Sequence, residues 1–217
     1  MNATVDPTAV VAAAVRAASR ASQTVGVFAE SSSAMFYVIR ELCRLERAPY
    51  CRLSSHYGSM GHAIAGALGF CAATGQRAIV VTGDGSFDLM NPMRVAVRHG
   101  LRLTMVVLND SRLTLPFLGA EHRGAKNAQE TTHLVPWDFT RQGSLQVGGR
   151  RVFDEAELDD AIAAALSFDG CYVVDAEIDP HVEPPVGTRI TGADALFGAP
   201  SPKRSPMHEE RLRHGDI

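Results

Sequence analysis

Two uninterrupted apolar segments, each closing in a polar turn, restrict the fold of this chain more than any other feature of its sequence. They are RAIVVTGDG at residues 77–85 and LRLTMVVLND at residues 101–110. Such continuous apolar runs are typical of strands buried on both faces of a parallel sheet. Between them, Asn91-Pro92 predicts a helix reaching about His99, because asparagine caps helices well and proline suits the first helical position. This strand–helix–strand order predicts two parallel strands.

The rest of the chain continues this alternation of helical and strand patterns. Its composition suits a packed core, since 46% of the residues are hydrophobic and 21% are charged. We therefore predict an α/β fold: a three-layer sandwich with a central, mostly parallel sheet and helices on both faces. Helices are expected over 7–21, after the loop that begins at residue 30, over 58–75 and from 154 to about 166; strands over 24–30 and 171–179; and loop with short helices over 111–150.

Length, charge and cysteine spacing narrow the class of protein. The 217 residues predict one domain, and the net charge of −3 argues against nucleic acid or a membrane as partner. Without a signal peptide pattern or an apolar run of the ~18–20 residues that span a membrane, we expect a cytoplasmic protein. The four cysteines form no CxxC pair, which argues against zinc and iron–sulfur sites. Because prolines and charges accumulate after Pro180, we predict a domain over 1–180 and a Pro-rich charged tail over 181–217.

Polar clusters stand where three of the predicted strands end. They are Glu30–Ser33, Gly83–Ser86 and Asn109–Ser111. In open parallel sheets, ligands bind beyond the carboxyl ends of the strands, where the helices begin. We therefore predict that the three clusters form one site.

The residue types in these clusters suit an anion held together with a metal ion. Gly83 and Gly85 allow backbone N–H groups to approach an anion closely, and Ser86 adds a hydroxyl. Asp84 and Asp110, which are 110 − 84 = 26 residues apart, supply hard oxygen ligands that suit Mg²⁺ beside a diphosphate. The GDG triplet and the Asn109-Asp110 pair each occur in ordinary turns as well. Their combination with two apolar strands is a more specific sign of a binding site. The chain has neither a GxxxxGK[ST] motif nor a dinucleotide GxGxxG motif.

These residues carry a resemblance to a known superfamily. The segment GDGSFDLMNPMRVAVRHGLRLTMVVLND resembles the thiamine diphosphate motif, which opens with GDG and closes with a pair of Asn or Asp residues. The preceding YGSMGHAIAGALGFCAATGQ is similar to the corresponding stretch of acetolactate synthases and pyruvate decarboxylases, and AESSSAMF is similar to one of their diphosphate-contacting loops. The resemblance covers about residues 24–180 and implies the diphosphate-binding (PP) domain of these enzymes, with thiamine diphosphate and Mg²⁺ as cofactors.

The resemblance assigns roles to individual residues. It implies that Asp84, Asp110 and the backbone carbonyl of Arg112 bind Mg²⁺. Asp110 stands where many relatives have Asn, and the spacing from Asp84 is one residue shorter than in many of them. The remaining implied contacts are Ser31, Ser33, Gly83, Gly85 and Ser86 on the diphosphate side, the Gly58 carbonyl on the aminopyrimidine, and Met60 as the prop that keeps the cofactor bent.

Several further side chains have two interpretations. His56, next to the Gly58–Met60 turn, can serve in proton transfer at the cofactor or in structure alone, so we include it with Met60 as a catalytic candidate. For His62 the structural interpretation, packing in the following helix, is preferred. The Arg112 guanidinium can bind a substrate carboxylate or lie in a solvated loop, and His122 belongs to the same loop region.

The resemblance also implies a missing part. The family activates its cofactor with a glutamate from a pyrimidine-binding (PYR) domain, which needs on the order of 150 residues more. We therefore expect a separate PYR-domain subunit, and an α2β2 heterotetramer because oligomers usually close symmetrically. The predicted function is an acetolactate synthase-like carboligase that decarboxylates a 2-oxo acid and passes the acyl group to an acceptor carbonyl. The alternatives are a non-oxidative decarboxylase subunit, similar to sulfopyruvate decarboxylase, and a non-catalytic PP-type scaffold.

Overall fold

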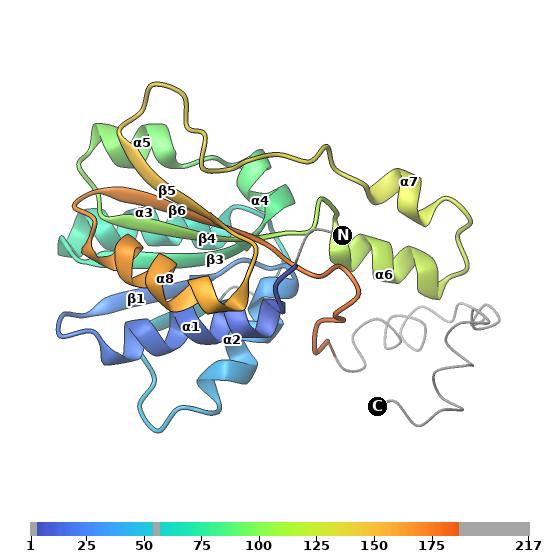
Figure 1. Ribbon diagram of the computed structural model, residues 1–217, viewed down its shortest axis with the longest axis horizontal. Helices are drawn as coiled ribbons and strands as arrows, with labels where there is room; N and C mark the ends of the chain where they lie inside the picture. Colours follow the sequence, from blue (N-terminus) through green and yellow to red (C-terminus); the bar gives the residue numbers. More distant parts are fainter. Residues whose placement is uncertain (1–3, 54–56, 187–217) are drawn as a thin grey trace.

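The fold is built on one sheet of six strands, seen in a computed structural model that describes residues 4–53 and 57–186 (Figure 1). All pairings between the strands are parallel, and their order is β2-β1-β3-β4-β6-β5. The strands are β1 (Val25–Ala29), β2 (Cys51–Leu53), β3 (Arg77–Gly83), β4 (Leu103–Asn109), β5 (Val147–Val152) and β6 (Cys171–Glu177). The helices are α1 (Pro7–Arg20), α2 (Ser33–Leu42), α3 (His62–Thr74), α4 (Asp84–Leu89), α5 (Met93–Arg98), α6 (Thr114–His122), α7 (Ala128–Thr132) and α8 (Leu158–Ser167), with a 3₁₀ turn at Glu155–Glu157.

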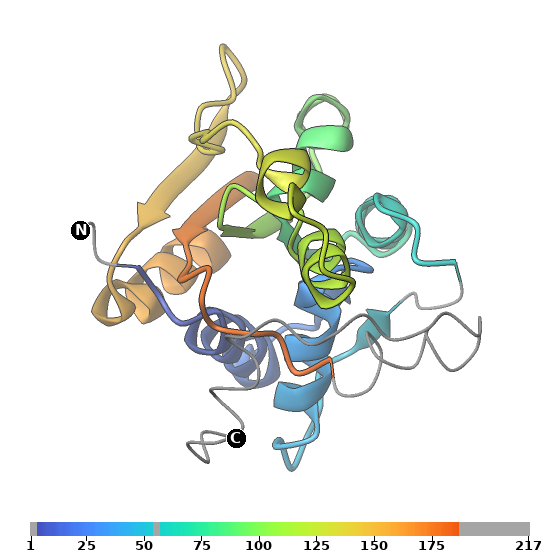
Figure 2. The ribbon, with the colours of Figure 1, turned by 90° about the vertical axis from the view of Figure 1, so that its right-hand side faces the viewer.

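Helices cover both faces of the sheet and make the molecule three layers deep. Helices α1, α2 and α8 pack on one face, and α3, α4 and α5 pack on the other (Figures 1 and 2). A separate apolar core lies between the sheet and each helical layer. The expected three-layer α/β sandwich is therefore confirmed, and its sheet is wholly parallel.

The continuous apolar runs follow from this double burial. Successive side chains of a strand point to opposite faces, so Ile79 and Val81 enter one core while Ala78 and Val80 enter the other. Strand β4 pairs in register with β3, from Ala78 opposite Leu103 to Gly83 opposite Leu108. The two strands therefore end side by side, and the turns that follow them are neighbours.

Two strands and one helix were not expected from the sequence. Residues 111–150 contain the short helices α6 and α7, but also the start of β5. The sequence VGGRRV of β5 is a poor strand pattern, because glycine and arginine contribute little to a sheet. The packing explains it, since a side chain at Gly149 would come within 2.8 Å of Thr140 Cβ. Strand β2 and helix α4 were also missed, and Pro92 separates α4 from the expected helix, α5.

The predicted tail lies almost entirely outside the described residues, so the domain boundary at residue 180 stays a prediction. The first residues beyond β6 contact the domain: Arg112 donates to the Pro180 carbonyl oxygen across 2.7 Å, and the Tyr37 hydroxyl donates to the Val182 carbonyl oxygen across 3.2 Å. Within the described part of the chain, no helix is long and apolar enough to cross a membrane.

Candidate active site

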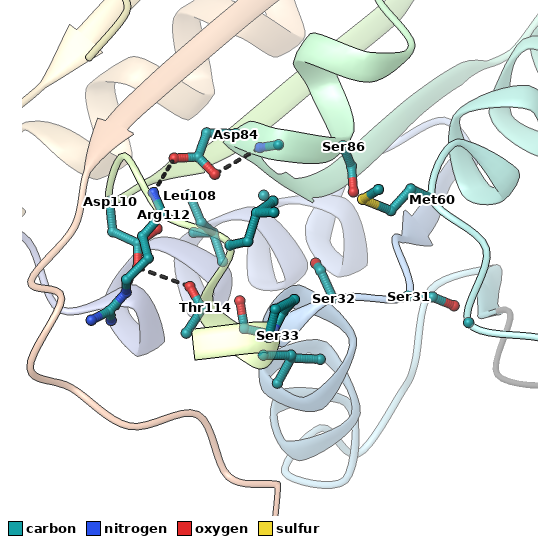
Figure 3. A pocket seen from close by; sticks show the side chains of 16 residues that line it. Ser31, Ser32, Ser33, Met60, Asp84, Ser86, Leu108, Asp110, Arg112 and Thr114 are labelled. Carbon is teal, nitrogen blue, oxygen red and sulfur yellow. Dashed lines mark hydrogen bonds and ion pairs between the residues drawn. The ribbon is translucent and has the colours of Figure 1, made fainter. Parts of the chain in front are cut away.

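The loops that follow β1, β3 and β4 converge on one pocket with a volume of about 300 Å³ (Figure 3). From β1 the chain moves outward to β2 and then returns to β3 on the opposite side of β1. Loops diverge at such a reversal and leave a crevice. Of the residues predicted for the site, the structure brings the following to this pocket: Ser31, Ser33, Gly58, Met60, Gly83, Asp84, Gly85, Ser86, Asp110 and Arg112. His56 lies outside the described residues.

Asp84 is buried at the start of α4 and is held by backbone groups from two loops. Its Oδ1 accepts a hydrogen bond from the Gly85 N–H at 2.7 Å, and its Oδ2 accepts one from the Arg112 N–H at 3.2 Å. Burial, and then the charge of Asp110, raise the pKa of Asp84 to about 7, against the lowering effect of the N–H groups. A cation bound nearby would favour the ionised carboxylate and so oppose both effects on the pKa.

Asp110 lies at the end of the neighbouring strand with its side chain only 3% exposed. Its Oδ2 accepts a hydrogen bond from the Thr114 hydroxyl at 2.8 Å and lies 3.4 Å from Arg112 Nη2. Burial raises the pKa of Asp110, while Thr114 and Arg112 lower it. Two neighbouring carboxylates whose burial disfavours ionisation, beside a backbone turn, form a donor set that fits a hard divalent cation such as Mg²⁺.

The Arg112 side chain turns into the protein and not toward the open side of the pocket. Its Nη2 contacts Asp110 and the Pro180 carbonyl, and its guanidinium lies over the Phe117 ring at 4.1 Å from the centroid. Nε is buried without a hydrogen-bond partner among the described residues. These contacts favour a role beside Asp110 over binding of a substrate carboxylate. Ser111 reaches a φ of +53°, so the backbone before Arg112 is constrained.

The serine residues after β1 form the opposite wall of the pocket. Ser33 is buried, and the side chains of Ser32 and Ser33 lie across from Asp84 and Ser86 (Figure 3). Ser32 was not among the predicted site residues. Its hydroxyl accepts a hydrogen bond from the Ala34 N–H at 3.2 Å and caps α2, and its place in the polar cluster was the available signal. Ser31 extends away from the other two toward the edge of the pocket (Figure 3).

The Gly58–Gly61 turn, which precedes α3, forms a third side. Gly58 and Gly61 have φ values of +62° and +87°, which glycine adopts without strain. A Cβ at Gly61 would also lie 2.6 Å from Met90 Sδ. Met60 lines the pocket and is 45% exposed, so its side chain is accessible to a ligand. The turn is anchored by Glu30, whose carboxylate accepts hydrogen bonds from the N–H groups of Gly61 and Ile64.

The apolar start of α6, which was not predicted to belong to the site, completes the pocket. The contributing residues are Leu113, Thr114, Leu115 and Pro116. Leu113 packs so closely over the turn after β3 that a Cβ at Gly85 would lie 2.5 Å from its Cδ2. The apolar sequence LTLPFL, directly after the polar cluster at 109–111, was the signal for this wall.

The two remaining histidine candidates lie apart from the pocket. His62 is the exposed first residue of α3 and lines a different groove, between α3 and β2. His62 therefore neither reaches the cofactor pocket nor packs in the core, and its structural role stays a prediction. His122 lies in the last turn of α6 and does not line the pocket.

Comparisons with known proteins identify a family for this chain. Residues 33–176 match the family described as thiamine pyrophosphate enzyme, C-terminal TPP binding domain, where TPP is another name for thiamine diphosphate. The chain belongs to this family. It is 31% identical over 133 residues to a Mycobacterium tuberculosis protein named "Putative acetolactate synthase large subunit IlvB2". The fold resembles benzoylformate decarboxylase from Polynucleobacter necessarius, with a TM-score of 0.70, 21% identity and 83% of this chain covered.

The matches cover only part of each relative. The chain spans 24% of the length of the Mycobacterium tuberculosis protein, to which 59% of this chain is aligned, and 34% of the benzoylformate decarboxylase chain. The family membership therefore concerns the thiamine diphosphate-binding domain.

Proposed function

We propose that this chain is the PP subunit of a split, Mg²⁺- and thiamine diphosphate-dependent enzyme that decarboxylates a 2-oxo acid and transfers the acyl group to an acceptor carbonyl. The observation that carries the proposal is the pocket at the sheet reversal, with two buried aspartates on one wall and serine hydroxyls on the other. The acetolactate synthase name of the Mycobacterium tuberculosis relative supports the carboligase over other reactions of the family.

The residues divide by chemistry between the metal and the diphosphate. Asp84, Asp110 and the Arg112 carbonyl would hold Mg²⁺, because they are hard oxygen donors on neighbouring loops. The Ser86 and Ser33 hydroxyls and the glycine backbone at the turn after β3 would face the diphosphate oxygens. Gly58 and Met60 stand at the open side, where the aminopyrimidine end would lie.

Bound thiamine diphosphate supplies a nucleophilic carbon and an electron sink for the decarboxylation of a 2-oxo acid. The described part of the pocket has no His, Glu, Lys or Tyr in its lining, so it holds few groups suited to proton transfer. What the chain supplies is binding and orientation: oxygen ligands for Mg²⁺ at the diphosphate end and the Met60 support at the other. The activating glutamate is assigned to a partner, and His56 remains a candidate for proton transfer.

A separate PYR-domain subunit is the proposed partner. The chain spans about a quarter to a third of the length of the two relatives it matches. Helix α3 has no Asp, Glu, Lys or Arg and exposes Ala65, Gly66, Gly69 and Ala72, a surface that suits close packing against another chain. Tyr57, which directly precedes Gly58 of the pocket lining, is 93% exposed and is a second candidate contact. Symmetric closure of two such pairs would give an α2β2 heterotetramer.

Two other functions share the same pocket. A decarboxylase that releases its product without an acceptor uses the same cofactor contacts, and only acceptor access separates it from a carboligase. A non-catalytic scaffold is motivated by Asp110 in place of Asn and by the short spacing to Asp84. The two buried aspartates argue against the scaffold, since without a cation their burial is unfavourable.

Reconstitution with the candidate partner tests the proposal. The chain, the partner and their mixture are assayed for CO₂ release from a panel of 2-oxo acids with thiamine diphosphate and Mg²⁺, with and without an acceptor carbonyl. We expect that only the mixture, and neither protein by itself, releases CO₂. When the acceptor carbonyl is added, the mixture should also form a carboligation product. CO₂ release without that product would favour the simple decarboxylase, and a mixture that binds no thiamine diphosphate and turns over no 2-oxo acid would favour the scaffold.

A further inference from the structure

Glu30 is a fully buried carboxylate that links two walls of the pocket. It follows β1 and lies on the sheet face that carries α3, as the alternation after Phe28 requires. Its Oε2 accepts a hydrogen bond from the Gly61 N–H at 2.8 Å, and its Oε1 accepts one from the Ile64 N–H at 3.0 Å. Both oxygens therefore act as acceptors, which is the pattern of an ionised carboxylate.

The charge of Glu30 is balanced by backbone groups and not by a cation. Among the described residues, no Lys, Arg or His forms an ion pair with it. Gly61 is the N-cap of α3 and Ile64 lies in its first turn. The carboxylate therefore accepts from N–H groups that have no partner within the helix, and it faces the positive end of a 13-residue helix. A buried charge is costly to maintain, and an apolar residue there would cost less. The presence of a carboxylate at this position therefore needs an explanation other than stability.

Glu30 connects the serine wall of the pocket to the Gly58–Met60 turn, and this connection is such an explanation. The Glu30 N–H donates to the Val81 carbonyl at 3.0 Å and its carbonyl accepts from the Ser32 N–H at 2.7 Å, so its backbone is fixed to the sheet and to the serine wall. Its side chain reaches Gly61, which directly follows Gly58–Met60. One residue thus sets the separation between the serine wall and the Gly58–Met60 turn.

We propose that Glu30 is a positioning residue that aligns the aminopyrimidine end of the cofactor with its diphosphate end. This inference rests on the proposed function. Glu30 contacts neither end directly; it acts through the Gly61 and Ile64 amides and so fixes where Gly58 and Met60 stand. The diphosphate contacts at Asp84 and Ser86 lie on α4. Ser33 follows the backbone of Glu30, whose hydrogen bonds to Val81 and Ser32 do not involve the side chain.

The test compares two ligands on one protein. The chain with its partner is titrated with thiamine diphosphate and with inorganic diphosphate, both in Mg²⁺, for the wild type and Glu30→Gln. The introduced side-chain amide would direct its own N–H groups at one of the two backbone donors, so the turn shifts. We expect thiamine diphosphate binding to weaken by about tenfold or more, and inorganic diphosphate binding to change less than about twofold. A structural role alone would weaken both ligands together.

Glu41→Gln is the matched control. Glu41 is also a buried glutamate, but it lies on α2, pairs with Arg44 at 2.7 Å and does not line the pocket. Glu41→Gln should leave the ratio of the affinities for thiamine diphosphate and inorganic diphosphate unchanged. If Glu30→Gln does not fold, Glu30→Asp, which is one methylene shorter, is measured instead against the same ratio.

The outcomes separate this inference from the proposed function. A wild-type complex that binds no thiamine diphosphate overturns the proposed function and the inference with it. A wild type that binds, with an unchanged ratio in the Glu30 variants, overturns the inference alone. Loss of folding in both variants would make Glu30 a structural residue and would also overturn it.

Discussion

The backbone N–H of Arg112 donates a hydrogen bond to Oδ2 of Asp84 across 3.2 Å and ties the loop after β4 to the turn after β3. Asp110, two residues earlier, adds its charge to the surroundings of Asp84 and helps to raise its pKa. The two aspartates thus form one electrostatic unit. The response of the chain to pH and to metal should depend on that unit.

Stability without metal should fall as the pH rises through neutrality. The pKa of Asp84 is raised from 3.8 to about 7 on folding, so the folded chain keeps a proton that the unfolded chain releases. This group alone should lower the free energy of unfolding by roughly 2 kcal/mol between pH 5.5 and pH 7.5. Urea unfolding in EDTA at both pH values measures it, and Asp84→Asn should remove that part of the slope. Equal slopes in both proteins would refute the prediction.

Asp110→Asn should move the pH dependence of Mg²⁺ binding. The amide keeps an oxygen for the metal but removes the charge that helps to raise the pKa of Asp84. Asp84 should then ionise at lower pH, and the midpoint of Mg²⁺ binding should shift to lower pH as well. Calorimetric titration with Mg²⁺ and thiamine diphosphate from pH 5.5 to pH 8 measures the midpoint. A shift to higher pH would contradict the coupling.

The side chain of Arg112 should act on the metal site and not on the substrate. In Arg112→Met, Asp110 loses the Nη2 contact at 3.4 Å, so cofactor and Mg²⁺ binding should change while the KM for the 2-oxo acid at saturating cofactor stays within about twofold. The alternative, a guanidinium on the substrate carboxylate, predicts a large rise in KM with unchanged cofactor affinity. Steady-state kinetics of the reconstituted complex, with a cofactor titration, distinguishes the two.

Two glycines in one turn should respond differently to alanine. A Cβ at Gly85 would lie 2.5 Å from Leu113 Cδ2, whereas at Gly83 the nearest atom is Ser32 Oγ at 3.8 Å. Gly85→Ala should destabilise the chain by about 1–3 kcal/mol as Leu113 and the start of α6 move. Gly83→Ala is the matched control and should cost less than about 1 kcal/mol. Urea unfolding without cofactor measures both, and equal losses would show that Leu113 adapts freely.

The parts of the fold that the sequence predicts well are those in which local pattern and burial agree. Strands β3 and β4 are buried on both faces and consist of continuous apolar runs, and the turns that follow them carry the polar groups of the pocket. Strand β5 was missed for the opposite reason. Its glycines fit under neighbouring side chains such as those of Thr140 and Tyr172, and no pattern within the strand records that packing.

The same distinction applies to the site. Asp84 and Asp110 follow the two predicted buried strands, so their position at one edge of the sheet could be predicted from the sequence. Glu30 belonged to a recognised polar cluster, but its hydrogen bonds reach 31 and 34 residues along the chain, so its connection to the Gly58–Met60 turn required the structure. The Leu113–Pro116 wall was missed because its segment was treated as loop with short helices and given no place in the site.

The most direct test of the central claim is calorimetric binding of thiamine diphosphate to the chain with its partner, in Mg²⁺ and in EDTA, for the wild type and Asp84→Ala. Asp169→Ala, which removes an exposed carboxylate paired with Arg102 away from the pocket, is the control. We expect Mg²⁺-dependent binding by the wild type and by Asp169→Ala, and loss of binding in Asp84→Ala. Binding of equal strength in Asp84→Ala, or in EDTA, would contradict it.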